Sequence, residues 1–314
     1  MSEILSVAFF AGLLAASVRL TIPILFTALG EAISEQSGIL NIGLEGYMLT
    51  GALAGFVGAY FLGGNLWMGV LVALVAGGLM GLLVGFLTIS LRADQVVAGV
   101  ALNIFALGVT DFAFRFIFSD QLKSPTTKPF PTYPIPFLAD LPVLGQALFD
   151  QSLFVYLGYW LVPVAWVVLY KTAFGLKIRA VGEKPEAADS TGISVYGVRY
   201  VCVVIAGALG GMGGAFLTLG TLNVFVENIT AGRGFIALTA VIFGGWHPWK
   251  ILGACLFFGL ADAVQLRMQA LDFGIPYQFL LMTPYVLTLI ALFSLAGRTK
   301  APSAITLPFV KEGR

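Results

Sequence analysis

Continuous apolar runs, most of them near twenty residues long, make up most of the sequence and constrain the fold more than any other feature. A helix of about twenty apolar residues is long enough to cross the hydrocarbon core of a bilayer. Strands of a membrane barrel would instead alternate apolar and polar residues over segments of about ten. Because the runs here do not alternate, we predict an all-α, polytopic helical membrane protein.

The low charged content supports this prediction. Only 11% of the 314 residues are charged and 59% are hydrophobic, whereas soluble domains carry about 25% charged residues. A chain with so few charges cannot cover a water-facing surface, which excludes a large soluble domain. The net charge of +1 gives no signal for nucleic acid. Cys202 and Cys255 lie inside apolar runs, where packing is their expected role.

We expect eight to ten membrane crossings in a single transmembrane domain that covers residues 1–314. The count is ten only if the first run breaks near Pro23. The run 235–246 is short and fits a tilted span, a broken helix or a re-entrant piece. A weak internal similarity between the stretches GILNIGLEGYMLTGAL and GFIALTAVIFGGWHPW indicates interrupted helices in two weakly related halves. The candidate spans are residues 4–30, 43–62, 66–91, 96–118, 153–170, 200–222, 235–246, 251–266 and 277–296.

Lysine and arginine are concentrated in the connection 171–199 and in the tail 297–314, which predicts that both are cytoplasmic. Four candidate spans separate them, and this even number returns the chain to the same side. The proline-rich connection 119–151 then lies outside the cell, as does the amino terminus if the first run crosses once. This connection is either a solvated loop or a docking surface for an external partner.

No catalytic motif appears in the sequence. The P-loop pattern G-x-x-x-x-G-K-[ST], the zinc motif H-E-x-x-H and the hydrolase motif G-x-S-x-G are all missing. The one histidine, His247, lies next to Pro248 and between two tryptophans, which is typical of a membrane interface. We therefore expect neither enzyme activity nor a metal site.

The stretch GEKPEAADSTGIS contains the signals of a short helix. Pro185 suits the first turn, and Glu186 complements the helix dipole. Ala187 and Ala188 are strong helix formers, and Gly192 suits the end. A helix of two turns is not stable alone in water. The residues alone leave two alternatives open: a solvated turn, or a helix that docks into a partner.

Polar side chains within the apolar runs cost free energy, about +2.5 to +3.5 kcal/mol for a central charge, so they usually face a cavity or a partner. Asp111 and Arg115 are four residues apart and predict a structural pair. Arg19 either snorkels or pairs with Glu31 or Glu35. The polar candidates are Asn41, Glu45, Asn103, Asp111, Arg115, Asn223, Asp262 and Gln265.

Glycines recur at the four-residue spacing that lets helices approach closely. Examples are Gly51-x-x-x-Gly55 and Gly77-x-x-x-Gly81, which we expect to be ordinary packing faces. The glycine-rich stretch 207–214 predicts either a bend or very close packing, since each glycine costs a helix about 1 kcal/mol relative to alanine.

Four stretches, SEQSGILNIGLEGYMLTGA, GEKPEAADSTGI, AGRGFIALTAVIFGGW and the ending LPFVKEGR, are similar to the membrane permease subunits of bacterial ABC importers. The wider group serves branched-chain amino acids, ribose-type sugars and nucleosides. The chain most resembles the nucleoside and simple-sugar branch, and the resemblance runs in order over essentially the whole sequence.

This resemblance implies a subunit that imports nucleosides or related ribosides across the cytoplasmic (inner) membrane, with its carboxyl terminus in the cytoplasm. It implies a second related permease chain or a second copy, two ATPase subunits and an extracytoplasmic solute-binding protein. ATP and magnesium would bind the ATPase subunits, and this chain would carry no cofactor. The alternatives are a simple-sugar permease and an ion-coupled transporter that uses Glu45 or Asp262.

The same resemblance assigns roles to individual residues. The short helix becomes the element that couples to the ATPase, through Pro185, Glu186, Ala187, Ala188, Asp189 and Gly192. An interrupted helix near Asn41 and Glu45 would face a sparsely polar substrate path, although a polar helix start at the membrane interface is the alternative. The expected path residues are Asn41, Glu45, Asn103, Asn223, Asp262 and Gln265.

Overall fold

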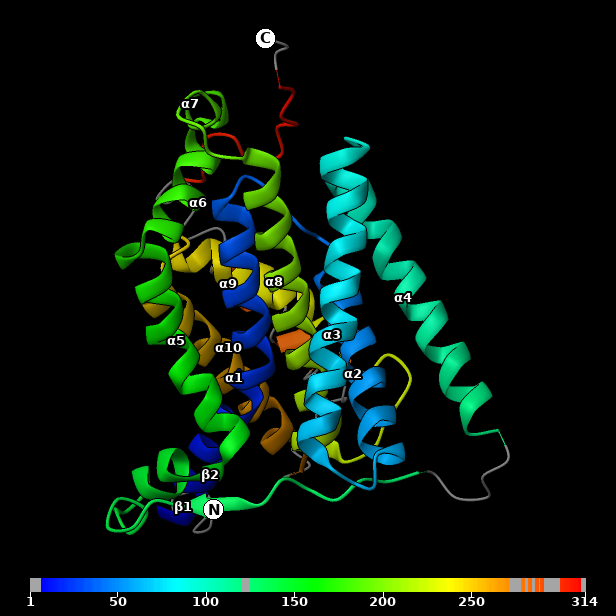
Figure 1. The fold of residues 1–314 in the computed structure, drawn as a ribbon. Coiled ribbons are helices and arrows are strands. Elements are labelled where there is room, and N and C mark those ends of the chain that lie inside the picture. Colours follow the sequence, from blue (N-terminus) through cyan, green and yellow to red (C-terminus); the bar gives the residue numbers. More distant parts are fainter. Residues whose placement is uncertain are drawn as a thin grey trace.

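The computed structural model describes residues 7–119, 125–270, 300–311 and four residue pairs between 278 and 290. Helices form one elongated bundle, and the two ends of the chain lie at opposite ends of it (Figure 1). The only strands among the described residues are β1 (Thr132–Pro134) and β2 (Asp150–Ser152), which pair antiparallel. The predicted all-α polytopic fold is confirmed.

The order of elements follows the predicted runs closely. Short π-helical segments extend α3, precede β2 and extend α8, at Phe86–Ser90, Gly145–Phe149 and Phe216–Leu222. The α-helices are α1 (Val7–Gln36), α2 (Leu44–Phe61), α3 (Leu66–Gly85), α4 (Gln95–Ile117), α5 (Leu153–Lys171), α6 (Ala173–Glu183), α7 (Pro185–Ser190), α8 (Val195–Ala215), α9 (Arg233–Gly244) and α10 (Pro248–Ala270).

Six helical segments of the described residues are long and apolar enough to cross a membrane. The run predicted at 235–246 is α9, a helix of 12 residues. The possible break near Pro23 is wrong, because α1 continues through this proline without interruption. The predicted span 277–296 falls largely outside the described residues, so the full number of crossings stays a prediction. The six segments are Phe9–Gln36, Leu66–Ser90, Gln95–Ile117, Leu153–Lys171, Val195–Leu222 and Pro248–Ala270.

Helix α8 lies at the centre of the bundle, packed against α1, α2 and α3. Its glycines allow this closeness: a Cβ added to Gly77 of α3 would lie 2.8 Å from the Cα of Gly211 and would also meet the carbonyl of Gly207. A Cβ added to Gly51 of α2 would likewise meet the Cα of Gly211. The predicted packing faces are thus confirmed here, and the stretch 207–214 packs closely within a continuous helix.

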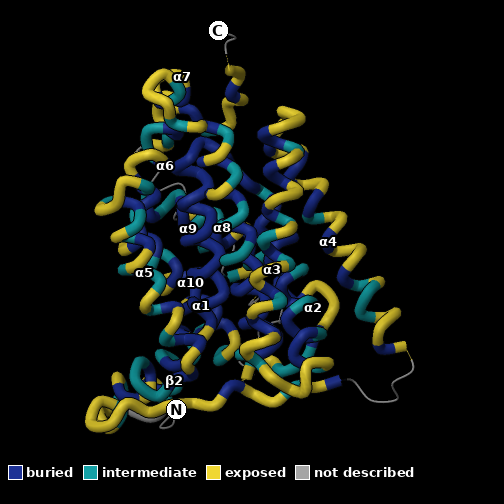
Figure 2. The backbone as a smooth tube through the Cα atoms, viewed as in Figure 1, coloured by how far each residue is buried: buried dark blue, intermediate teal, exposed yellow. Residues whose placement is uncertain are grey.

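The outer surface of the bundle is apolar, as a bilayer requires. Exposed residues cover the outward side of α4 along its whole length (Figure 2). The side chains of Ile104, Phe112 and Phe116 are among the most exposed of its large hydrophobic groups. Polar groups are instead collected inside the bundle, where protein atoms can satisfy their hydrogen bonds.

The predicted pair of Asp111 and Arg115 is wrong. The Arg115 guanidinium donates to Glu227 instead, from Nε at 2.6 Å and from Nη2 at 2.9 Å. Glu227 follows α8 in the sequence, and the long arginine side chain at the end of α4 reaches across to it. These hydrogen bonds hold the pKa of the Glu227 carboxyl below its ordinary value. Arg19 is exposed, and the described ion pairs include none between it and the buried Glu31 or Glu35.

We predict that Gly77→Ala destabilises the bundle, whereas the neighbouring Gly78→Ala does not. The Cβ at position 77 meets backbone atoms of α8, which cannot move aside, while the nearest atom to a Cβ at position 78 is 3.7 Å away. Overpacking of this kind costs about 1–3 kcal/mol. Size-exclusion analysis after heating in detergent would measure both variants. Equal melting of the two would contradict the close contact between α3 and α8.

Candidate functional site

The chain between α1 and α2, residues 37–43, is non-helical yet largely buried inside the bundle. Irregular backbone at membrane depth is tolerated only where protein or a water-filled cavity satisfies its polar groups. Here side chains from other segments supply the partners. The Asn41 N–H donates to Glu31 Oε1 at 2.8 Å, and the Leu40 N–H donates to Gln95 Oε1 at 2.8 Å. The structure thus shows a non-helical connection between two separate helices, with Glu45 in the first turn of α2, and an interrupted helix that faces a path stays a prediction.

Asn103 holds the two sides of this break together. From α4, its Nδ2 donates to the carbonyl of Ile42 at 3.0 Å, and its Oδ1 accepts from the Gly46 N–H at 2.8 Å. One amide thus satisfies one backbone group before the start of α2 and one within its first turn. Asn41 acts locally, since its Oδ1 accepts from the Gly43 N–H at 2.8 Å.

The carboxylate of Glu45 caps the amino end of α9. Its Oε1 accepts from the Gly232 N–H at 2.7 Å and from the Thr230 hydroxyl at 2.5 Å, and its Oε2 accepts from the Gly234 N–H at 2.7 Å. The first amide groups of a helix have no partners within the helix, and the helix dipole favours negative charge there. Gly234 is required for the approach, because a Cβ at this position would lie 2.7 Å from the Cα of Glu45.

The starts of two helices, α2 and α9, therefore meet at Glu45, and they are the two helix starts that the weak internal sequence similarity paired. An ion pair lies at the same helix end. Arg233, the first residue of α9, places Nη2 3.8 Å from the Oδ2 atom of Asp262 on α10. Asp262 is 6% exposed, so this carboxylate is buried.

The two remaining path candidates have different surroundings. Gln265 is buried one turn after Asp262 on the same helix. Asn223 ends the π-helical segment after α8 with a positive φ of 58°, and its carbonyl accepts from the Thr127 N–H at 2.9 Å. Asn41, Glu45 and Asn103 thus lie around the non-helical stretch before α2. Asp262 of α10 lies beside the first residue of α9, and Asn223 contacts the 119–151 connection. Their role along a substrate path stays a prediction.

Sequence reasoning missed the role of Glu31 and Glu35, which it considered only as partners for Arg19. Both are buried one turn apart on α1. Glu31 holds the break, as described above, and Glu35 accepts a hydrogen bond from the Trp246 indole at the end of α9. Two carboxylates four residues apart within an apolar run could have indicated a buried polar site, because a carboxylate in such a run needs a buried partner.

The predicted short helix is confirmed as α7, which projects from one end of the bundle (Figure 1). Pro185 and Ala188 are buried against the rest of the protein, whereas Glu186, Ala187 and Gly192 are exposed. Asp189 lies 3.4 Å from the Nζ atom of Lys311 in the tail. The connection 171–199 and the tail therefore lie on the same side of the bundle, as the charge pattern predicted.

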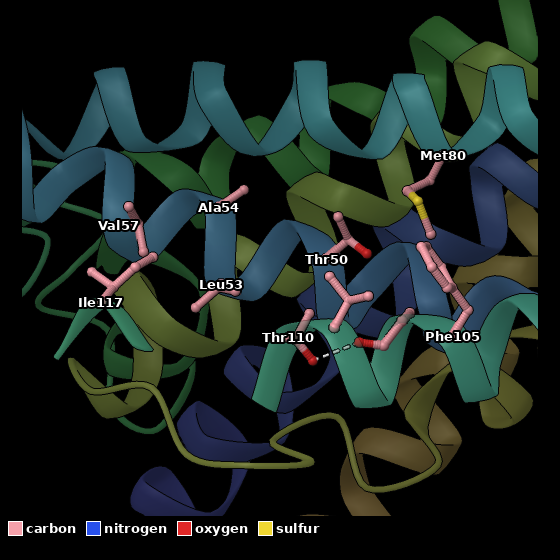
Figure 3. A pocket seen from close by; sticks show the side chains of 10 residues that line it. Thr50, Leu53, Ala54, Val57, Met80, Phe105, Thr110 and Ile117 are labelled. Atoms are coloured by element: carbon pink, nitrogen blue, oxygen red, sulfur yellow. Dashed lines mark hydrogen bonds between the residues drawn. The ribbon is translucent and has the colours of Figure 1, made fainter. Parts of the chain in front are cut away.

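A hollow of about 200 Å³ lies between α2, α3 and α4. Figure 3 shows Thr50, Thr110 and Phe105 among the side chains that line it, and Thr110 turns its hydroxyl to the carbonyl of Ala106 at 2.7 Å. Its walls are almost wholly apolar, and none of the six predicted path residues lines it. Among the described residues, no group of three His, Cys, Asp or Glu side chains could hold a metal ion.

A helical bundle with an apolar exterior and polar groups collected inside it is typical of a multi-pass membrane protein. The chain belongs to the family of permease components of the branched-chain amino acid transport system, whose profile matches residues 13–294. It is 42% identical over 300 residues to the guanosine ABC transporter permease protein NupQ of Bacillus subtilis, covering 93% of this chain and 94% of that protein.

Two further relatives cover most of the chain. The nucleoside ABC transporter permease protein NupC of Lactococcus lactis is 37% identical over 298 residues, covering 92% of this chain and 93% of that protein. TsgC13 of Haloferax volcanii, provisionally named a glucose ABC transporter permease protein, is 42% identical over 269 residues, covering 85% of this chain and 80% of that protein.

We predict that Glu45→Ala lowers the melting temperature of the purified protein in detergent, because it leaves the Gly232 and Gly234 amides without a partner. Each buried unsatisfied group costs about 1–3 kcal/mol. Glu45→Gln retains one acceptor oxygen, so its melting temperature should lie between those of the wild type and the alanine variant. Asp140→Ala removes an exposed carboxylate and serves as the matched control. If Glu45→Ala melts like this control, the carboxylate does not hold the two helices together.

Proposed function

We propose that this chain is the transmembrane subunit of an ATP-driven importer that moves nucleosides, or related ribosides, into the cytoplasm. The observation that carries the proposal is the 42% identity to a guanosine ABC transporter permease over nearly the full length of both chains. A second relative named for nucleoside transport supports the same substrate class.

A simple-sugar permease is the second candidate, because TsgC13 is as similar in identity and is named for glucose. An ion-coupled transporter has less support. The carboxylates that it would use are both engaged: Glu45 holds the amino end of α9, and Asp262 lies beside Arg233. A coupling carboxylate must release and rebind its ion during each cycle, and these two already hold structural partners.

The proposed assembly contains a second permease chain or a second copy, cytoplasmic ATPase subunits that bind ATP and magnesium, and an extracytoplasmic solute-binding protein. We place α7 and the tail in the cytoplasm, where α7 would dock on an ATPase subunit. Its exposed residues Glu186 and Ala187 and its projection from the bundle support this placement. In this orientation the connection 119–151 faces the binding protein.

Movement of α7 would reach the non-helical stretch before α2 through the buried Arg199. This residue of α8 donates from Nε to the carbonyl of Ser37 at 3.2 Å and from Nη1 to the carbonyl of Leu307 at 3.1 Å. Ser37 begins the break before α2, and the tail that contains Leu307 pairs with α7 through Lys311. We therefore propose that Asn41, Glu45, Asn103, Asn223, Asp262 and Gln265 border the path that opens when these segments shift.

We predict that cells carrying this transporter take up radiolabelled guanosine, and that excess unlabelled uridine or adenosine reduces this uptake while excess glucose does not. The physical reason is that a path for nucleosides is built for a planar base as well as a hydroxylated sugar. Deletion of the gene should abolish the uptake, and its reintroduction should restore it. Competition by glucose but not by nucleosides would favour the sugar permease instead.

We also predict that Ala187→Arg abolishes uptake without changing the amount or the monodispersity of the protein. Ala187 is exposed on α7, so an arginine fits the isolated chain but blocks a docking groove. The matched control is Ala173→Arg, an exposed alanine at the start of α6. We expect uptake to fall at least about tenfold for Ala187→Arg, since a blocked contact of this kind costs more than 1.4 kcal/mol. Uptake that survives in Ala187→Arg would rule out docking through this face.

A further inference from the structure

A second hollow lies at the end of the bundle that carries α7. Its volume is about 250 Å³, and it opens to the surface. It is bordered by the ends of α1 and α5, by α6, by the turn between α9 and α10, and by the tail. No residue of the proposed path or of α7 lines it. The side chains that form its walls are Gln36, Tyr170, Arg179, Glu183, Trp246 and Lys300.

The charges of this pocket favour an anion. The charged side chains that line it are two cations, Arg179 and Lys300, and one carboxylate, Glu183. The Glu183 carboxylate already has a partner, because its Oε2 accepts a hydrogen bond from the Ser303 hydroxyl at 2.7 Å. The nearby imidazole of His247 adds no charge near pH 7, since burial and then Lys250 lower its pKa. The pocket therefore carries a net charge of +1 from its lining side chains.

Two buried polar atoms of the pocket have no partner. Gln36 is 5% exposed, and its Nε2 donates to the carbonyl of Trp246 at 2.7 Å, which leaves Oε1 without a donor. The guanidinium carbon of Arg179 lies 5.0 Å from the centre of the Tyr170 ring, and its Nε has no acceptor. Buried donors and acceptors are seldom left unpaired, because each unpaired group costs free energy.

We propose that this pocket binds a phosphate ester that also carries a hydroxyl group. Arg179 and Lys300 hold the phosphate, since guanidinium and ammonium groups form strong charge-assisted hydrogen bonds with phosphate oxygens. Gln36 Oε1 accepts from the hydroxyl group of the ligand. Tyr170 fixes the plane of the guanidinium, so that its donors point in one direction.

Two sources supply this chemistry: the headgroup of an anionic glycerophospholipid, or a soluble nucleoside monophosphate. The pocket lies at the ends of α5 and α9, where the level of lipid headgroups is expected, and basic pockets between helices bind such headgroups. The same opening is accessible to a soluble ester. Binding at this pocket does not depend on which solute the protein transports.

Binding at this pocket would also hold the tail in place. Lys300 belongs to the tail, which is attached to α6 by a hydrogen bond from the Ala304 N–H to the carbonyl of Gly182 at 2.8 Å. Further along, Lys311 pairs with Asp189 of α7. A ligand between Arg179 and Lys300 therefore joins α6 to the tail and restrains α7 through it.

The test uses the full chain in phosphatidylcholine nanodiscs, in two arms. In the first, the protein is titrated with a radiolabelled nucleoside 5′-monophosphate, with inorganic phosphate and the matching nucleoside as competitors. In the second, phosphatidylglycerol is added to the nanodiscs and the bound lipid is counted by native mass spectrometry. Binding in one arm identifies the source, and competition by inorganic phosphate but not by the nucleoside identifies the phosphate as the recognised group.

Arg179→Gln and Lys300→Gln should each weaken binding by about tenfold or more, because each removes a charge-assisted contact. Lys177→Gln is the matched control, since Lys177 is exposed on the same helix and does not line the pocket. Lys300 is exposed in the tail, so its variant tests the pocket even if Arg179→Gln folds poorly. The proposal is overturned if neither arm shows binding, or if Lys300→Gln binds as tightly as Lys177→Gln.

Discussion

The rest of the structure depends on the contact between the Glu45 carboxylate and the amino end of α9. Two helices start inside the bundle, and a helix start inside a membrane protein exposes amide groups that water cannot reach. One carboxylate satisfies two of these amides and faces the positive end of the helix dipole. Both helix starts become tolerable because they meet, and neither would be stable if it faced lipid.

Close helix packing makes this meeting possible. The glycines of α2, α3 and α8 remove the side chains that would hold the helices apart, and the backbones touch directly. Polar groups are then drawn inside, where Glu31, Gln95 and Asn103 satisfy the backbone of the break. At the α7 end, Arg199 contacts both the break and the tail. The non-helical stretch before α2 and the exposed helix α7 are thus linked by one continuous set of contacts.

Much of the fold could be predicted from local sequence. The length of the apolar runs located the spans, and the proline, glutamate and glycine around Ala187 located α7 within a residue or two. Charge placement put the tail and the 171–199 connection on one side, which the contact between Asp189 and Lys311 confirms. The candidate site could be predicted only in part: Asn41, Glu45 and Asn103 were selected as polar residues in apolar runs, but their partners were not.

By itself, the sequence determined where helices form and which of them are long and apolar enough to cross a membrane, because helix length, capping and hydropathy are properties of neighbouring residues. Only the tertiary structure decided which polar groups meet. Arg115 turns to Glu227 rather than to Asp111, and Glu45 binds amides almost two hundred residues away. Such partners are set by how the helices pack, since a buried charge must take whichever group the neighbouring helix brings within hydrogen-bond distance.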